Sequence, residues 1–483
     1  MGLVRYFLIL LLLIPSLGWS ACTWEGSTGT VASPYAPADV QACVDTASAK
    51  TGDVVIFIPG SATWSGTSYS AVAINMTSWA ADKVTIAGAG TSTTVLTLTM
   101  TGDGAAFGVT GKDGIGFEVK DIGVIYGNTA AVYFLRLAGG MGRTSPHTKG
   151  INIHGNSFTR AAGTSSPTAV LAAARIYGVI HNNTFSNVRA LMTNMSASLA
   201  DQDYEWTQAA GLGGNRFIFV ENNSIELAID AIDGYASSRT VVRYNNFTNT
   251  FFQSHSGTAN CVRGYRALEI YNNIFAYDGS RPTTISRPIF LRSGSGVIYN
   301  NTLSGTLTNV SPYIDLDYEL ACNTCCWVMP GGLVNRSTPG VNLTWDSTTN
   351  PSCSTYPCQD QIGAGIDTGW GTAQTVEGLY AWNNTTPTGN ITMRLNPSMC
   401  AATSTIIQSN RDYFNVASVT AAKAAGLAAD YAAYTCPHPL AGSGTCGTTV
   451  GRGGYALGAV APTVTIGSGA AVTLGTGAVG TLY

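Results

Sequence analysis

Hydrophobic and polar positions in the middle of this chain repeat: a short apolar run ends at an asparagine-containing turn, and a hydrophobic residue follows. The six copies are His154-Gly155-Asn156-Ser157-Phe158, His181-Asn182-Asn183-Thr184-Phe185, Glu221-Asn222-Asn223-Ser224-Ile225, Tyr244-Asn245-Asn246-Phe247, Tyr271-Asn272-Asn273-Ile274-Phe275 and Tyr299-Asn300-Asn301-Thr302-Leu303. Their closing apolar residues lie 27, 40, 22, 28 and 28 residues apart. Such a period is typical of one supersecondary unit that buries its apolar face only against its neighbours. Because the units read as strands, the pattern predicts an all-β fold, a parallel β-helix over residues 21–310.

The segment before the repeat predicts how this solenoid begins. Residues 38–49 read as a short helix, and Asp53 to Pro59 read as a strand. A helix at this point caps the first coil and covers its open strand edge. The repeated asparagines are expected to stack at a turn, where each amide bonds the next one and the nearby backbone.

After Leu303 the rhythm stops. Residues 311–440 are expected to form a cysteine-rich cap or set of loops, in which Trp382-Asn383-Asn384 suggests one last coil. Residues 418–434 are alanine-rich with an apolar spacing near 3.6, which predicts a C-terminal helix. Residues 441–483 form a tail rich in glycine, threonine and alanine, in which Val460 to Tyr483 show period-2 alternation.

The first twenty residues read as a secretory signal. Arg5 supplies the positive start, Leu8 to Leu13 the apolar core, and Gly18-Trp19-Ser20 a small-x-small cleavage site. The apolar run is too short to span a bilayer. A lipoprotein signal at Cys22 fits less well, because Trp19 stands where leucine is usual. The sequence therefore predicts a secreted protein, extracellular or at the cell surface, with no membrane span.

Composition agrees with this class of protein. Charged residues make up only 11 %, hydrophobic residues 45 %, and there are 56 glycines, which excludes a disordered chain and suits many strands and tight turns. The net charge of −3 and the lack of a recognised motif argue against a nucleic-acid partner.

Eleven cysteines follow the signal, at positions 22, 43, 261, 322, 325, 326, 353, 358, 400, 436 and 446. In an exported protein they are expected to form disulfides, with one left over. Cys22 with Cys43 and Cys436 with Cys446 are the expected local pairs. A zinc site at Cys322-x-x-Cys325 is disfavoured, because no histidine lies near it.

The most specific residues lie between Ile229 and Phe275. They are Asp230-Ala-Ile-Asp233-Gly234, Arg243-Tyr-Asn245, His255, Arg263-Gly264-x-Arg266 and Glu269-Ile-Tyr-Asn-Asn273. With the coils from about Asp39 to Leu303, they resemble the right-handed parallel β-helix proteins of the pectate-lyase-like superfamily. The resemblance implies that fold. It does not define one activity, since the superfamily includes lyases, hydrolases, epimerases and phage tail spikes.

One pair of side chains stands out on the predicted outer wall. Asp233 lies eight residues after Ile225, and His255 lies eight residues after Phe247. These equal offsets predict the same angular position on adjacent coils, whose strands lie about 4.8 Å apart. An imidazole beside a carboxylate makes an acid or an oriented base, and Asp230 can join the cluster. The alternative is a turn aspartate and a structural histidine bonded to a loop.

Arginines gather in the same region. Residues 239–292 contain seven arginines, at 239, 243, 263, 266, 281, 287 and 292, against two acids, Glu269 and Asp278, a local charge of +5. Guanidinium groups match carboxylates in a bidentate way, so an acidic polysaccharide of uronates is the expected partner. Part of the set is expected to be structural, and Arg243 and Glu269 are candidates for an ion pair across coils.

Lyase-type cleavage of a uronate glycan is the favoured function. The resemblance to pectate lyases implies Arg263 or Arg266 as the base and calcium as a cofactor. The catalytic candidates are His255, Arg263 and Asp233; the substrate-binding candidates are Arg243, Arg266 and Glu269; the calcium-binding candidates are Asp230 and Asp233.

Two other functions stay open. One is a non-catalytic glycan-binding or matrix β-helix. The other is a glycoside hydrolase, because the order Asp, Asp, His, Arg along the chain resembles that of the polygalacturonases. The Asp-Asp pair and the Gly-His-Gly of polygalacturonases are missing, however, and Ser254-His255-Ser256-Gly257 stands instead.

Overall fold

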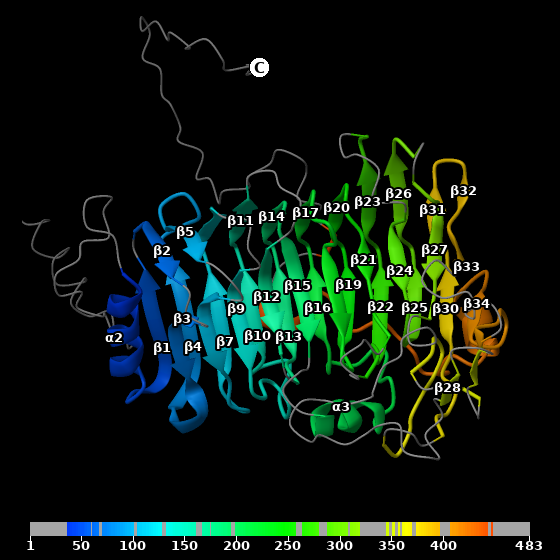
Figure 1. Ribbon diagram of the computed structural model, residues 1–483, viewed down its shortest axis with the longest axis horizontal. Helices are drawn as coiled ribbons and strands as arrows, with labels where there is room; N and C mark the ends of the chain where they lie inside the picture. The colour runs from blue at the N-terminus through cyan, green and yellow to red at the C-terminus, as the bar shows by residue number, and fades with distance from the viewer. Residues whose placement is uncertain are drawn as a thin grey trace, which may run out of the picture. The chain divides into compact units, whose positions relative to one another are not determined.

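The computed structural model describes residues 36–447 with gaps, all within one compact unit, Met1–Thr449. The gaps are residues 59, 67–69, 101–103, 128–131, 161–166, 174, 195–198, 257–262, 280–286, 308–309, 319–343, 347–349, 353–355, 358–359, 370–372, 397–405 and 443–445. Figure 1 shows the strands of this unit following one another in stacked coils from β1 to β34.

Three long sheets form the coils, and each takes every third strand of the chain. Sheet 1 contains β1 Thr51–Ile58, β4 Ala80–Gly88, β7 Gly116–Lys120, β10 Ile151–His154, β13 Gly178–His181, β16 Ile218–Glu221, β19 Arg239–Arg243, β22 Ala267–Tyr271, β25 Ser295–Tyr299, β30 Leu379–Trp382 and β34 Tyr413–Asn415. Sheet 2 contains β2 Ala62–Gly66, β5 Val95–Met100, β8 Gly123–Tyr126, β11 Ser157–Arg160, β14 Thr184–Ser186, β17 Ser224–Glu226, β20 Asn246–Thr248, β23 Ile274–Tyr277, β26 Thr302–Gly305, β31 Thr385–Thr386 and β32 Gly389–Asn390. Sheet 3 contains β3 Ser70–Asn75, β6 Ala105–Thr110, β9 Tyr133–Ala138, β12 Thr168–Ala172, β15 Arg189–Asn194, β18 Ile232–Tyr235, β21 Phe252–Gln253, β24 Ile289–Leu291, β27 Tyr313–Leu316 and β33 Thr392–Leu395.

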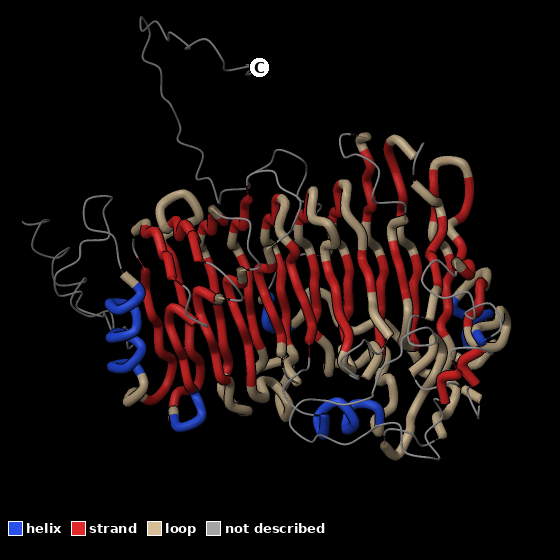
Figure 2. The backbone as a smooth tube through the Cα atoms, viewed as in Figure 1, coloured by secondary structure: helices blue, strands red, loops and turns tan. Residues whose placement is uncertain are grey.

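Neighbouring strands in these sheets are parallel, except for the antiparallel pair β31 and β32. The fold is therefore a right-handed parallel β-helix, as predicted. The coils extend beyond residue 310, because β30, β31, β33 and β34 join the sheets (Figure 2). Outside them, β28 Thr344–Asp346 and β29 Asn350–Ser352 form a separate antiparallel pair.

The core is built by the closing apolar residues of the repeat. Phe158, Phe185, Phe247 and Phe275 are each fully buried. The rings stack coil on coil, with centroids 5.0 Å apart for Phe158 and Phe185 and 4.6 Å for Phe247 and Phe275. One turn of chain cannot bury such rings alone, so each coil depends on its neighbours.

The asparagines of the repeat form a continuous ladder. Its described members are Asn156, Asn183, Asn223, Asn245, Asn273, Asn301 and Asn384. In each rung the backbone N–H and Nδ2 both donate to Oδ1 of the next asparagine, as from Asn273 to Asn301 at 3.1 and 2.9 Å. The residue before each rung is left-handed, with φ of 56° at Asn272 and 58° at Tyr244. The predicted asparagine stack is confirmed.

Helices cover parts of the solenoid. They are α2 Pro37–Ala47, α3 Leu199–Trp206 and α5 Val419–Ala424, with the 3-10 helices η1 Met76–Ser78 and η3 Pro439–Ala441. Helix α2 packs against β1 and β3 and caps the first coil, as expected. The C-terminal helix is shorter than the predicted 418–434. After Ala424 the chain continues in turns and places Tyr431 and Tyr434 against sheet 1.

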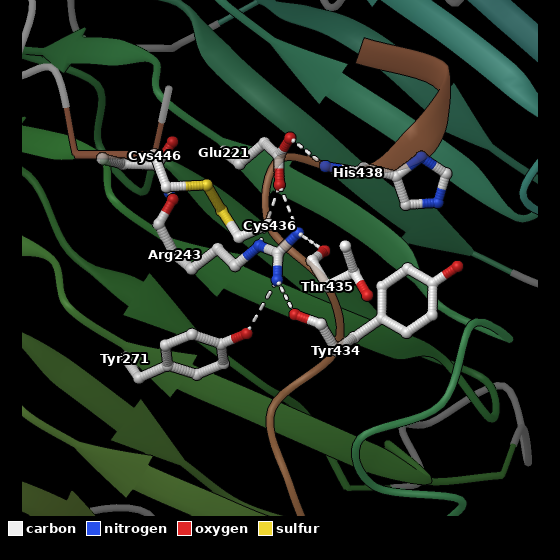
Figure 3. Close-up of a disulfide and its surroundings, with 9 residues drawn as sticks. Glu221, Arg243, Tyr271, Tyr434, Thr435, Cys436, His438 and Cys446 are labelled. Atoms are coloured by element: carbon white, nitrogen blue, oxygen red, sulfur yellow. Dashed lines mark hydrogen bonds and ion pairs between the residues drawn. A yellow bond between two sulfur atoms is a disulfide. The ribbon is translucent and has the colours of Figure 1, made fainter. Parts of the chain in front are cut away.

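Residues 418–442, here called the C-terminal strap, cover the outer face of sheet 1. Their Ala422, Leu427 and Tyr431 pack with outward residues of the sheet such as Phe219 and Tyr271 into a second apolar cluster. Figure 3 shows the strap beside the disulfide that joins Cys436 and Cys446, which confirms that expected pair.

Several expectations concern other parts of the chain. Residues 1–20, Cys22, Cys261, the cysteines from 322 to 400 and the tail from residue 448 lie outside the described residues. Cys43 is disulfide-bonded. No helix among the described residues is long and apolar enough to cross a membrane.

Candidate active site

The outer face of sheet 3 carries the predicted pair, Asp233 and His255. Side chains of a strand alternate between core and exterior, so residues one and three positions after an inward residue point outward. Ile232, Phe252 and Ile289 are the inward residues of three successive coils and lie side by side.

One outward row follows directly after these inward residues, and a second follows three positions after them. The first row contains Asp233, Gln253, Phe290, Asp315 and Arg394. The second contains Tyr235, His255 and Arg292. The two rows bring a carboxylate, a phenol, an imidazole and a guanidinium together from three coils.

His255 stands at the centre of this group. Its Nε2 lies 3.1 Å from Asp233 Oδ1, which confirms that the two residues meet. The strand register differs from the expected one, in which Asp233 and His255 occupy equivalent positions on adjacent coils. Instead, Tyr235 lies beside His255, and Gln253 lies beside Asp233. The Tyr235 and His255 rings meet edge to face, with centroids 6.1 Å apart. The imidazole is about one-fifth exposed, at 19 %, so it is reachable from outside.

Arg292 shares the same imidazole nitrogen. Its Nη2 lies within hydrogen-bond distance of His255 Nε2. A guanidinium has no acceptor, so Arg292 donates and Nε2 accepts. Bonds to other described residues also fix this arginine, from Nε to Ser254 O at 3.0 Å and from Nη2 to Gln253 Oε1 at 3.0 Å.

Opposing effects set the charge of Asp233. Burial raises the pKa of its carboxyl, but His255 and the cations Arg189 and Arg292 outweigh burial and hold the pKa below its ordinary value. Asp233 is therefore a carboxylate at neutral pH. Burial, with the charge of Asp233, raises the pKa of Tyr235 to about 12, so its phenol stays protonated.

Asp230 belongs to the same network but not to a calcium site. Its carboxylate accepts from Arg189 and from Gln253 Nε2, and Arg189 also lies 3.8 Å from Asp233. Both proposed calcium ligands thus already face a guanidinium. Within the described ranges, no group of three His, Cys, Asp or Glu side chains is placed to hold a metal ion. The two carboxylates do not fit calcium.

The sequence-predicted base, Arg263, lies away from this face. Its guanidinium is fully buried over the ring of Trp206 and bonded to Asp360, Asp367 and Asp203. These carboxylates outweigh burial and raise its pKa still further. A base must lose its proton, and this surrounding opposes that loss. The contacts favour a structural role.

The three predicted substrate-binding residues, Arg243, Arg266 and Glu269, also lie elsewhere. Arg266 Nη1 donates to Glu377 Oε2 at 2.9 Å, and its Nη2 to Gln208 O at 2.6 Å. Glu269 accepts from the Gly213 N–H at 2.6 Å and from the Tyr431 hydroxyl at 3.0 Å. These contacts hold surrounding loops and the strap to sheet 1.

The expected ion pair between Arg243 and Glu269 is wrong. The register puts Arg243 beside Tyr271, and Glu269 beside Val241. Arg243 Nε donates instead to Glu221 Oε2 at 2.8 Å, as Figure 3 shows. Its two terminal nitrogens donate to the Tyr434 and Thr435 carbonyls of the strap.

Comparison with known protein families found no family that matches the chain, and comparison with curated proteins found no match either. The β-helix fold itself is shown by its three parallel sheets.

Three contributors to the site were not assigned from the sequence: Arg292, Arg189 and Tyr235. A usable signal exists for two of them. Tyr235, His255 and Arg292 each stand three positions after an inward apolar residue. Aligning coils on those inward residues of sheet 3, rather than on the asparagine turns, finds this row.

Proposed function

We propose that the protein is a secreted polysaccharide-active β-helix protein of the pectate-lyase-like kind, which cleaves an acidic uronate glycan by β-elimination on the outer face of sheet 3. The convergence of Asp233, His255 and Arg292 from three successive coils is the observation that carries the proposal. In the proposed reaction these three would serve as the base, as a carboxylate that stabilises the protonated base and as a cation for the substrate.

Each side chain has a distinct role in this reaction. His255 Nε2 removes the proton α to the uronate carboxylate, and the C–H electron pair forms a double bond to the β carbon. The bond from the β carbon to the glycosidic oxygen breaks, and that oxygen leaves with its electron pair. The Tyr235 phenol is positioned to give it a proton. Arg292 faces the substrate carboxylate, where negative charge develops.

Further cations along sheet 3 suit a polymer rather than a single sugar. Arg287 lies 3.7 Å from the centre of the Phe290 ring, and Arg394 lies 4.2 Å from that of Tyr313. The Arg394 side chain is 43 % exposed. Arg287 lies on the same coil as Arg292, and Arg394 lies two coils further on. Both also pair with Asp315, at 3.4 and 2.8 Å, and in the proposal they bind neighbouring carboxylates of a chain lying across the coils.

Hydrolysis is less well supported. A glycoside hydrolase needs one carboxylic acid that keeps its proton at working pH. Asp233 has the opposite property, because its pKa is lowered. A non-catalytic glycan-binding protein would use the same cations, and turnover separates the two functions.

The test uses the secreted full chain with a panel of uronate polymers. Wild type is expected to release unsaturated uronate products, seen by ultraviolet absorbance, and His255→Ala to lower the rate by roughly a hundredfold or more. His147→Ala is the matched control, because His147 is an exposed loop histidine. Binding with no unsaturated product from any polymer would instead support the glycan-binding function.

A further inference from the structure

The lone pair that the proposed reaction requires is already engaged in the free protein. His255 Nε2 must be unprotonated to accept a hydrogen bond from Arg292. A proton from the substrate would have to enter at the same nitrogen. The contact with Arg292 therefore both orients the His255 imidazole and blocks its Nε2.

We propose that Arg292 is a specificity-determining residue, which holds the lone pair of His255 until a substrate carboxylate draws the guanidinium away. The inference rests on the proposed function and adds to it a preference for free acid over ester. A carboxylate is the better partner for a guanidinium, because a bond between two ions is shorter and stronger than one to a neutral imidazole.

The surroundings of Arg292 allow this exchange without loss of the site. Its Nε stays anchored on Ser254 O, while Nη2 is the atom that contacts His255. The Phe290 ring, 4.8 Å from the guanidinium carbon, supports the flat group. A change of partner at Nη2 therefore needs only a local movement.

Asp233 completes the exchange. Once Nε2 has taken the substrate proton, the imidazolium lies 3.1 Å from Asp233 Oδ1, whose negative charge stabilises it. Among the described residues, the charged groups around the imidazole are Asp233 and Arg292, with Arg189 and Asp230 behind the carboxylate. A neutral or esterified sugar offers no anion to Arg292, so the base stays blocked.

The test compares a polyuronate with its methyl ester for wild type, Arg292→Gln and Arg292→Lys. Wild type is expected to favour the free acid. Loss of a charge-assisted contact predicts a KM for the acid roughly ten- to a hundredfold higher in Arg292→Gln, with faster cleavage of the ester, because the base is no longer blocked. Arg292→Lys is expected to recover part of the preference for acid. An equal fall on both substrates in Arg292→Gln would overturn the proposal, because a merely structural arginine gives that result.

A second readout separates this inference from the proposed function. The His255 imidazole is observed by NMR in the full chain, assigned with His255→Gln, while a monomeric uronate or a neutral hexose is added. The uronate alone is expected to shift its signals, and only when Arg292 is present. An Arg292-dependent shift without turnover on any polymer would support the exchange of partners by Arg292 and reject the lyase function. Turnover with no Arg292-dependent shift would reject the exchange and leave the lyase.

Discussion

Two buried glutamates on the outer face of sheet 1 show how the nearest partner decides the charge of a residue. Burial raises the pKa of both carboxyls. Beside Glu118, however, lie His154 Nε2 at 3.0 Å, the Thr85 hydroxyl at 2.9 Å and Lys83 Nζ at 3.2 Å, and its pKa falls to about 2. Glu269 bonds to the neutral Gly213 N–H and Tyr431 hydroxyl, so burial prevails and its pKa rises to about 7. At Glu118 two hydrogen-bond donors and the Lys83 cation together outweigh burial, whereas the two neutral donors at Glu269 do not.

Glu269→Gln is expected to flatten the pH dependence of stability. The folded pKa of Glu269 lies above its ordinary value of 4.5, so its contribution is complete below that pH and is lost as pH rises through about 7. The upper limit of this loss is about 3 kcal/mol. Thermal unfolding at about pH 5 and about pH 8 measures it, and the fall in Tm should be smaller in the variant.

Glu118→Gln is the matched control, because its sign is opposite. The lowered pKa of Glu118 stabilises the fold above pH 4.5, and that stability is lost as pH falls toward about 2. The variant should therefore lose Tm near neutral pH and approach wild type in acid. If the pH dependence of Tm changed in the same direction in both variants, the identity of the neighbouring groups would not explain the opposite pKa shifts of the two carboxyls.

At the scale of the elements, each asparagine turn contains two neighbouring residues with different structural roles. Asn301 lies in the ladder, where its Nδ2 donates to Ile270 O at 2.9 Å and to Asn384 Oδ1 at 2.8 Å. Asn300 is exposed, with a φ of 54°. The first needs its amide, and the second needs only a left-handed backbone, which glycine also adopts.

Asn301→Ala is expected to cost about 2–4 kcal/mol of unfolding free energy. It removes a buried amide and leaves the Asn273 N–H and Nδ2 without their acceptor. Asn300→Gly should change stability by about 1 kcal/mol or less. Urea unfolding measures both, and similar losses in the two variants would show that the ladder is not the stabilising feature of the turn.

The sequence could predict those features that arise between adjacent coils. The strands, the ladder and the contact of Asp233 with His255 all join residues about one period apart, and the period is visible in the apolar pattern. The capping helix follows from local residues. The partners of Arg263 could not be found in this way, because Asp360 lies 97 residues along the chain, in a segment without the repeat. The sheet-2 turns do not give the register on sheet 3, because the segment between the two sheets differs in length from one coil to the next.

At the scale of the whole described unit, the two outer faces differ in what covers them. On sheet 3 the face holds charged side chains, and His255 is partly exposed. On sheet 1 the strap covers aromatic residues that stack coil on coil, with ring centroids of Tyr271 and Tyr299 4.7 Å apart and those of Tyr299 and Trp382 4.5 Å apart. The strap is held by polar contacts too, since the His438 N–H donates to Glu221 at 2.9 Å. We therefore interpret it as part of the fold.

Truncation after residue 417 tests this role of the strap. The shortened chain would expose the Tyr271–Trp382 stack, so we expect a lower Tm and binding of a hydrophobic dye. The double variant Cys436→Ser with Cys446→Ser keeps the strap and opens only a loop with a separation of 10 residues, at a cost of about 2–3 kcal/mol. Because sheet 3 carries the proposed site, the double variant should retain uronate cleavage. If truncation left Tm unchanged and bound no dye, the strap would be dispensable and the face of sheet 1 would be stable in water without it.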